Sequence, residues 1–420
     1  MSQVHATSTW TIQDVQTNGT LGVLSLALDA NDDPHITYYK YFMNDYHNPL
    51  NLTLASWNGS AWETQTLESG QESGLESSLA LDSLNNPHIC YVYSTPSGFY
   101  LKYTSWTGSE WNNQTVDSSL AGPFGLEPCS IAIDSDDNPH IVYSAYDSDL
   151  GITLKYARWS GSNWSIQTID SEAFSIRGFY GTSISVGSNN YPRVIYGESA
   201  VIDGAVTNSS VVRYAEWNGQ NWSIQTVYPN VDSFGNLALD SNGYPHFTYL
   251  VEASLRYASW DGSTWNTQIV DSNTSISDSS FVALDSHGNP HVSYYEGPEI
   301  GSDTGGSLMY AYWNSSAWNT ETVTKNEIMR GAGLIVLDSS DTPHLCYSNI
   351  YFSGPYSYCD IKYATRIEST TTTSPSTTVV IVVVALVAVV AVTVLTFYFK
   401  KRKSATTVAT KSSENPSEPL

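Results

Sequence analysis

The sequence predicts an all-β fold, a seven-bladed β-propeller, followed by one transmembrane helix near the C-terminus. Two observations predict it: a segment ending in Pro-His recurs with a nearly constant period, and an uncharged apolar run extends from Val379 to Phe399. Aromatic residues make up 13% of the chain and charged residues only 14%, a composition that suits many packed strands and argues against a disordered chain.

The repeat is marked by a histidine that follows a proline. Successive copies are 53, 52, 53, 53, 45 and 53 residues apart, and the fourth copy has arginine in place of histidine. A fixed period of this size, with a β-strand pattern, is typical of one propeller blade per copy. The marking residues are His35, His88, His140, Arg193, His246, His291 and His344.

Each copy contains four predicted strands. The first is a short apolar run, such as 25–29, with a small residue between two larger ones, which is typical of an innermost strand buried on both faces. The second starts at the Pro-His pair, because proline is tolerated at the first position of a strand. The third carries a Leu-Lys-Tyr signal, as at Tyr103, and the fourth follows a hairpin.

Twelve of the thirteen tryptophans form pairs five residues apart around this hairpin. In the first copy we expect Gly59 and Ser60 to form a type II′ turn, which sets Trp57 opposite Trp62 as a cross-strand aromatic pair. The sixth copy has Ser315 at the glycine position and is expected to turn less tightly. The pairs either pack between blades, which we favour, or form a sugar-stacking platform repeated around the rim.

The seventh copy runs from Leu334 to Arg366 and has no fourth strand. At the other end of the chain, the segment Trp10-Thr-Ile-Gln13 matches the fourth-strand segment Trp62-Glu-Thr-Gln65 of the first copy. We therefore expect the N-terminal strand to complete the last blade, which closes the ring and removes two sheet edges. The propeller is expected to span residues 9–368.

The apolar run 379–399 is long enough, at about 1.5 Å per residue, to cross a hydrocarbon core of about 30 Å as a helix. Basic residues follow at once, so the positive-inside rule places the tail, 400–420, in the cytoplasm and the N-terminus outside. Residues 369–378 have the composition of a Thr/Ser-rich stalk. We expect a single-pass protein of the cell membrane, although Met1 to Trp10 has no apolar core of a signal peptide.

The part of the chain before residue 379 is strongly acidic. It holds 12 of the 17 basic residues and 39 of the 41 acidic residues, a net charge of −27. A domain of this charge repels nucleic acid and other polyanions, so we expect no nucleic-acid partner. Neutral glycans, basic proteins and cations are left as partners.

None of the four cysteines has the spacing of a zinc site. Cys346 and Cys359 flank one predicted hairpin, so they are our candidates for a disulfide between adjacent strands in an oxidising compartment; two buried thiols are the alternative.

The repeated histidines and their partner aspartates lie around a ring and cannot converge on one ion, so we expect hydrogen bonds that fix the hairpin. No cofactor is expected. Residues 134–138 and 31–33 only weakly resemble calcium loops, which leaves Ca²⁺ as the one metal to consider.

The connections between first and second and between third and fourth strands hardly vary, whereas the other connections differ in length and sequence. Loops on a rigid scaffold can vary without cost to the fold, so function is expected on the variable face. No catalytic residue is predicted. The candidate ligand-binding residues are Tyr46, His47, Tyr100, Arg177, Tyr180, Glu296 and Arg330.

The repeated motifs, Pro-His-x-x-Tyr and Leu-Lys-Tyr-Ala-x-Trp-x-Gly-Ser-x-Trp, resemble those of BNR/sialidase-like β-propellers, and their sevenfold repetition is similar to that of seven-bladed propeller lectins. The resemblance covers about residues 9–366. For sialidases it implies an arginine triad that binds a carboxylate, a Tyr/Glu nucleophile pair, an Asp acid and Asp-box turns. The turns here lack that Asp and only Arg177 and Arg330 reach the variable face, so sialidase activity is disfavoured.

The sequence therefore predicts a cell-surface recognition or adhesion propeller that binds glycan or protein ligands, with avidity if several shallow sites are used. One alternative is a sialidase-like glycoside hydrolase with its site at the mouth of the central channel, and another is a structural protein of the cell envelope. We expect binding rather than catalysis. Nine N-x-S/T sequons are candidate glycosylation sites: Asn18, Asn51, Asn58, Asn113, Asn163, Asn208, Asn221, Asn273 and Asn314.

Overall fold

The structure of this chain is a computed structural model. It describes residues 4–17, 25–40, 50–70, 73–95, 98–118, 120, 129–147, 149, 151–172, 179–202, 205–273, 275–298, 305–329, 333–353 and 356–372. These residues form strands and turns, and none of them lies in a helix. The expectation of an all-β fold is confirmed for this part of the chain.

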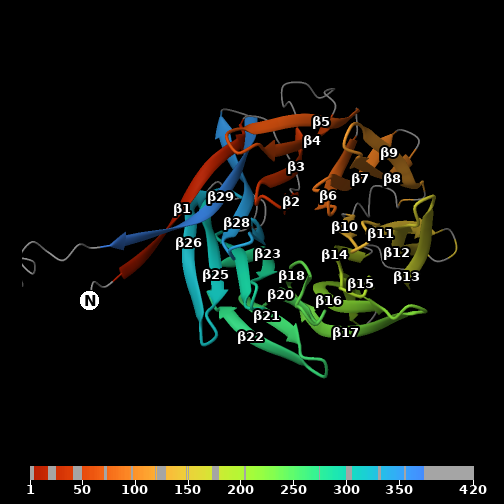
Figure 1. Ribbon diagram of the computed structural model, residues 1–420. Helices are drawn as coiled ribbons and strands as arrows, with labels where there is room; N and C mark the ends of the chain where they lie inside the picture. Colours follow the sequence, from red (N-terminus) through yellow and green to blue (C-terminus); the bar gives the residue numbers. More distant parts are fainter. Residues whose placement is uncertain are drawn as a thin grey trace, which may run out of the picture. The chain divides into compact units, whose positions relative to one another are not determined.

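The strands form seven sheets around a central axis, as the blades of a propeller (Figure 1). Blade 1 contains β2 (Ser25–Leu28), β3 (Pro34–Lys40), β4 (Leu50–Trp57) and β5 (Trp62–Gly70). Blade 2 contains β6 (Ser73–Leu81), β7 (Pro87–Thr95), β8 (Gly98–Trp106) and β9 (Trp111–Asp117). Blade 3 contains β10 (Ser130–Ile133), β11 (Pro139–Asp147), β12 (Gly151–Trp159) and β13 (Trp164–Glu172). Blade 4 contains β14 (Phe179–Val186), β15 (Pro192–Ile202), β16 (Ala205–Trp217) and β17 (Trp222–Val231).

The remaining blades follow the same plan with two variations. In blade 5 the first strand is split into β18 (Ser233–Phe234) and β19 (Ala238–Leu239), which both pair with β20 (Pro245–Val251); β21 (Ser254–Trp260) and β22 (Trp265–Asp271) complete the sheet. Blade 6 contains β23 (Ile276–Leu284), β24 (Pro290–Glu296), β25 (Gly306–Trp313) and β26 (Trp318–Glu327). The last sheet has the order β27 (Leu334–Leu337), β28 (Pro343–Ser353), β29 (Tyr356–Thr372) and β1 (Val4–Gln16).

The first strand of each blade lies nearest the axis, and all described strand pairs are antiparallel (Figure 1). First strands of neighbouring blades contact each other, as β2 contacts β6 and β6 contacts β10. The second strands begin at the proline of each Pro-His pair, as predicted, because a strand's first residue need not donate to the ladder. The predicted count of seven blades is confirmed.

The hydrophobic core lies between the blades rather than within them. Each of seven clusters of buried side chains joins two neighbouring blades; Tyr39 and Leu52 of blade 1, for example, pack with Tyr91 of blade 2. The cluster between blades 7 and 1 contains Ile361 and Ile36. Since burial of each large apolar side chain contributes about 1.5–3 kcal/mol, these clusters fix every blade against the next and make the scaffold rigid.

The disulfide lies elsewhere than predicted. Cys90 is joined to Cys129, with a Cα–Cα distance of 6.2 Å, while Cys346 and Cys359 are both buried thiols. The predicted Cys346–Cys359 bond is wrong because Cys346 lies opposite Tyr363. Cys359 is therefore offset from it along the strands by about 13 Å, which is beyond the reach of a disulfide. Burial raises the pKa of the Cys346 thiol.

The first-copy hairpin has two of the predicted features, a positive φ at its glycine and a pair of facing tryptophans. Gly59 has a φ of 86°, Trp57 lies opposite Trp62, and the two rings meet edge to face at 5.5 Å. The sixth copy contradicts the expectation of a looser turn, because Ser315 takes a φ of 69° and the turn closes in the same way. The side-chain oxygen of Asn314 accepts the backbone N–H groups of the next turn residues and holds this conformation.

The chain divides into two units. One is the propeller, Trp10–Arg366, and the other comprises Met1–Thr9 and Ile367–Leu420, of which the structure describes only the ends of β1 and β29. Residues 369–372, expected to begin the stalk, form the end of β29. Within the described residues no helix is long and apolar enough to cross a bilayer. The predicted span and cytoplasmic tail, 379–420, lie outside the described residues.

Candidate functional site

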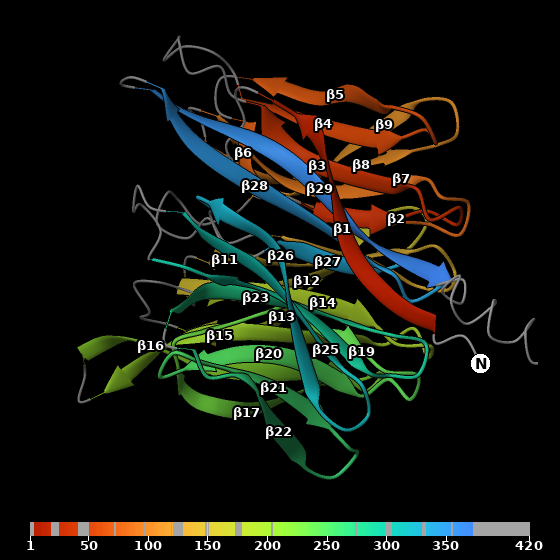
Figure 2. The ribbon, with the colours of Figure 1, turned by 90° about the vertical axis from the view of Figure 1, so that its left-hand side faces the viewer.

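The connections between strands fall on two faces of the propeller (Figure 2). The turn face carries the turns between first and second strands and the hairpins between third and fourth strands, as at 29–33 and 58–61 in blade 1. The loop face carries the connections between second and third strands and those between successive blades, as at 252–253 and Asp232. The loop face is the variable face of the sequence.

The repeated histidine is a structural group on the turn-face side of six of the seven blades. His140 has no exposed surface; its Nε2 lies 3.0 Å from the Asp134 carboxylate, and its Nδ1 lies 2.6 Å from the hydroxyl of Tyr156. Burial lowers the pKa of His140, although Asp134 opposes the shift. The imidazole is thus neutral, donating through Nε2–H to the carboxylate and accepting at Nδ1 from the tyrosine.

The same contact recurs in four other blades, between His88 and Tyr103, His246 and Tyr257, His291 and Tyr310, and His344 and Tyr363. In blade 1 the third strand has Leu54 instead of tyrosine, and His35 Nδ1 lies 2.8 Å from the Ser56 hydroxyl. In blade 4 the buried Arg193 forms an ion pair with Glu216 at 3.0 Å. These side chains are used by the fold, as the sequence predicted.

A second repeated contact lies nearer the loop face at five of the seven blade junctions. The hydroxyl of the buried Tyr143 in blade 3 donates to the Asp117 carboxylate of blade 2 at 2.8 Å, and Lys155 Nζ lies 3.4 Å from the same oxygen. Burial raises the pKa of Tyr143, so the phenol stays protonated and donates. Equivalent pairs are Tyr91 with Glu68, Tyr196 with Asp170, Tyr294 with Asp271 and Tyr38 with Gln16.

The tryptophans pack between blades, which supports the first of the two interpretations. The second tryptophan of a pair meets the third-strand tyrosine of the preceding blade edge to face: Trp164 meets Tyr103 at 5.1 Å and an interplanar angle of 73°. The pairs Trp222–Tyr156, Trp265–Tyr214, Trp318–Tyr257 and Trp62–Tyr363 repeat this contact. The first tryptophan of each pair covers the second and is half-buried.

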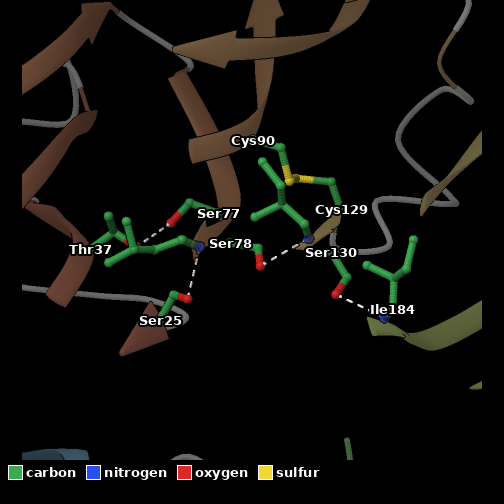
Figure 3. The surroundings of a disulfide bond; sticks show 10 residues. Ser25, Thr37, Ser77, Ser78, Cys90, Cys129, Ser130 and Ile184 are labelled. Atoms are coloured by element: carbon green, nitrogen blue, oxygen red, sulfur yellow. Dashed lines mark hydrogen bonds between the residues drawn. A yellow bond between two sulfur atoms is a disulfide. The ribbon is translucent and has the colours of Figure 1, made fainter. Parts of the chain in front are cut away.

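Near the axis, small polar side chains connect the first strands (Figure 3). The backbone N–H of Ile131 donates to Ser78 Oγ at 3.2 Å, and that of Ile184 donates to Ser130 Oγ at 3.2 Å. The disulfide between Cys90 and Cys129 crosses the junction between blades 2 and 3 in the same layer. Sequence reasoning missed it because the two cysteines meet only across blades.

The candidate ligand-binding residues lie mostly outside the described residues. This holds for Tyr46, His47, Arg177 and Arg330, and for the side chain of Tyr180 in β14.

Two of the candidates are described, and both are half-buried at the loop face. Tyr100 lies opposite Tyr93, whose ring is 4.0 Å from Lys102 Nζ, and Glu296 accepts a hydrogen bond from the side chain of Asn273. They belong to blades 2 and 6, which are not adjacent, so the structure does not bring them together.

Among the residues that the structure describes, one group of side chains has the ligand types for a metal ion: Asp285, His287 and Asp341, whose ligand atoms all lie within 4.8 Å of one another. The Asp341 carboxylate already accepts hydrogen bonds from the N–H and hydroxyl of Ser286, at 2.7 and 2.6 Å, across the junction of blades 6 and 7. Sequence reasoning missed the group because it spans two blades. The turn at 134–138 is closed by Asp134 Oδ1, which accepts backbone N–H groups.

Comparison with known proteins supports the propeller fold but does not assign the chain to a family. No family model and no curated protein matches this chain. Solved structures of similar fold include an ulvan lyase of polysaccharide lyase family PL25 bound to -[GlcA(1-4)Rha3S]-, with a TM-score of 0.56 and 12% identity over 83% of this chain and 94% of that one.

Two other matches are weaker. The SapL1 lectin in complex with alpha methyl fucoside has a TM-score of 0.44 and 13% identity over 72% of this chain and 97% of that one. A mutant NanB sialidase from Streptococcus pneumoniae has a TM-score of 0.42 and 13% identity over 84% of this chain and 69% of that one. At such identities the likeness is one of fold alone.

Proposed function

We propose that this chain is a surface-recognition protein whose propeller binds a glycan or protein ligand with its loop face. One observation carries the proposal: the repeated titratable side chains and tryptophans of the described blades are engaged in contacts that build the scaffold. His140 is held by Asp134 and Tyr156, and Tyr143 by Asp117. The copies of the repeat differ most, in length and in sequence, in the loop-face connections. A rigid scaffold tolerates specific binding residues in such connections.

The charge of the domain narrows the ligand. A net charge of −27 before residue 379 disfavours anionic polymers such as sulfated or uronic-acid glycans. We therefore favour a neutral or amine-bearing glycan, or a basic protein surface. The fold neighbour with a TM-score of 0.56 is a polysaccharide lyase bound to -[GlcA(1-4)Rha3S]-, an acidic glycan, so it shares the scaffold and not the ligand class that we favour.

We also infer that β1 is the outer strand that closes the ring. Four contacts of the first strand support this. The Trp10 ring meets Tyr310 of blade 6 at 5.2 Å and 72°, as the other tryptophans meet their tyrosines. The Thr11 hydroxyl donates to the carbonyl of Thr365, Lys362 Nζ lies 2.6 Å from Asp14, and Gln16 accepts from the hydroxyl of Tyr38.

The anchoring at the cell surface is part of the proposal. The apolar run 379–399 followed by basic residues supports a single span with the propeller outside. The Cys90–Cys129 bond is consistent with an oxidising compartment, because disulfides persist there and are rare in reducing ones.

The test is binding by the soluble fragment 2–368 to an array of neutral, amine-bearing and acidic glycans, run beside panels of fluorogenic glycosides and of polysaccharides scored for lyase products. We expect retention on neutral or amine-bearing glycans without turnover. Turnover of any substrate would replace the binding proposal with an enzymatic one. Absence of binding to every glycan, and to the surface of intact cells, would contradict it.

Matched variants locate the site. Tyr100→Ala and Glu296→Ala change half-buried loop-face side chains in two different blades. The control is Glu110→Ala on the turn face, where the side chain is exposed. If the loop face binds, at least one loop-face variant weakens binding tenfold or more, a change of about 1.4 kcal/mol, while the control binds as the parent does. Loss of binding in the control alone would place the site on the turn face.

A further inference from the structure

The structure separates the sequons by their surroundings. We propose that N-linked glycans attach to the turn-face hairpins and to the outer strand of blade 2, and not to Asn51 and Asn273, the two described sequons near the loop face. The proposal concerns covalent modification and does not depend on the identity of the ligand. Seven of the nine sequons have described side chains, and Asn18 and the side chain of Asn208 lie outside the described residues.

Four sequons lie in the hairpins between third and fourth strands, and all four asparagines are exposed. Asn58 and Asn314 occupy the first position of their hairpins, and Asn163 and Asn221 occupy the last. Hairpins of this kind project from the blade edge, so a bulky sugar at Nδ2 meets solvent rather than protein.

The turn survives the modification because its backbone N–H groups bond to the other side-chain atom. The Nδ2 group of Asn58 donates to the carboxylate of Glu63, which is exposed, whereas the partner of Asn273 is half-buried. Asn58 Oδ1 accepts the backbone N–H groups of Ser60 and Ala61 at 3.0 and 2.9 Å, and Asn314 Oδ1 does the same for its hairpin. In the transfer, Nδ2 forms a bond to the anomeric carbon of an oligosaccharide carried on a lipid phosphate. The bond from that carbon to the phosphate oxygen breaks, the lipid phosphate leaves, and one Nδ2 proton passes to a base of the transferase. One N–H and the whole Oδ1 acceptor remain.

The fifth sequon lies on an outer strand. Asn113 is the third residue of β9, the fourth strand of blade 2, and its side chain is exposed. An outer strand has no neighbour on one edge, so a sugar there displaces no blade contact.

The two described sequons near the loop face differ from these five. Asn273 is half-buried, its Nδ2 donates to the Glu296 carboxylate, and its Oδ1 accepts the N–H of Ser275. Asn51, at the start of β4, is half-buried and its Oδ1 has no solvent contact. A pyranose ring on either amide would have to displace packed neighbours, at the cost of the contacts they make.

The experiment measures occupancy at each site. The full chain, preceded by a cleavable export signal, is produced in a eukaryotic secretory pathway, and each asparagine is scored after enzymatic release of the glycan in heavy-oxygen water. We expect occupancy above about half at the five turn-face and outer-strand sites and below about a tenth at Asn51 and Asn273. High occupancy at Asn51 or Asn273 in protease-resistant protein overturns the proposal, as does absence of glycan from all five exposed sites.

A matched variant tests the hairpin argument directly. Asp261→Asn creates the triplet Asn-Gly-Ser at the hairpin position that Asn58 occupies, and Asp261 Oδ1 already accepts the N–H groups of Ser263 and Thr264. The variant is expected to gain one glycan without loss of protease resistance. A folded variant that stays unmodified would contradict the claim that this hairpin position is open to the transferase.

Discussion

At the scale of single residues, the buried histidines make the stability of the fold depend on pH. Burial lowers the pKa of His35, His88, His140, His246 and His291, with the nearby aspartate opposing the shift in each case. A lowered folded-state pKa means that the unfolded chain binds more protons below its own pKa of about 6.5. The stability from these neutral histidines is therefore present above pH 6.5 and is lost as the pH falls below it.

The aspartates make the stability of the fold depend on pH in a second, lower pH range. Burial alone would raise the pKa of Asp134, but hydrogen bonds from His140 and Asn138 lower it overall. Asp82, Asp285 and Asp338 are shifted in the same direction. A carboxyl whose folded pKa is lowered contributes stability above its unfolded pKa, near 4, and that stability is lost below it.

We predict a free energy of unfolding that is flat from pH 8 to 7, falls as the pH drops below 6.5, and falls again below 4. Denaturant titrations at fixed pH values measure it. His140→Gln should cost about 1.5–3 kcal/mol at pH 7, because a charge-assisted buried hydrogen bond is lost, and should flatten the slope between pH 6.5 and 5. Equal slopes for parent and variant would show that His140 does not carry this dependence.

Ser315 offers a second prediction at this scale. Its φ of 69° lies in the left-handed region, which costs a residue with a Cβ about 1 kcal/mol. Replacement by glycine removes this cost, but part of the gain is lost because glycine has a larger conformational entropy in the unfolded chain. Ser315→Gly should raise the free energy of unfolding by about 0.5 kcal/mol. Gly59→Ser, the reverse change in blade 1 at φ 86°, should lower it. Opposite signs for the two variants in thermal melts are the expected result, and a shared sign would reject the argument.

At the scale of strands, one position recurs at the blade junctions. The residue four places before the end of the first strand of a blade meets the residue two places after the histidine of the preceding blade. Ser77 Oγ lies 3.1 Å from Thr37 Oγ1 (Figure 3). Ser280 Oγ lies 2.7 Å from Thr248 Oγ1. The disulfide of Cys90 and Cys129 occupies this position between blades 2 and 3.

We therefore predict that the double variant Thr248→Cys with Ser280→Cys forms a second disulfide. In the parent protein the hydroxyls of Thr248 and Ser280 occupy the position at their junction that the bonded sulfurs of Cys90 and Cys129 occupy at theirs. The loop would span 32 residues against 39 for the native bond. Chain entropy then gives an upper gain of about 3.5 kcal/mol. Peptide mapping under non-reducing conditions detects the bond, and Thr248→Cys alone is the control. Free thiols in the oxidised double variant would contradict the equivalence of the two junctions.

The same strands show what the sequence could and could not predict. Pro-His pairs and tryptophan spacing depend on contacts inside one blade, so four strands per copy and the pairing of Trp57 with Trp62 followed directly. The Cys90–Cys129 bond could not be predicted, because it depends on which residues meet across blades. The tight turn at Ser315 could not be predicted either, because the side chain of Asn314 holds the turn against the backbone preference of serine. Loop-face residues have no repeat to align, so their roles remain proposals.

At the scale of the whole molecule, ring closure can be tested by comparing two tryptophans. Trp10 meets Tyr310 at 5.2 Å and Trp62 meets Tyr363 at 5.4 Å, with the same interplanar angle of 72°. If β1 is the outer strand of the last blade, Trp10→Ala and Trp62→Ala should each cost about 2–4 kcal/mol of unfolding free energy. A Trp10→Ala variant as stable as the parent would leave β1 outside the ring.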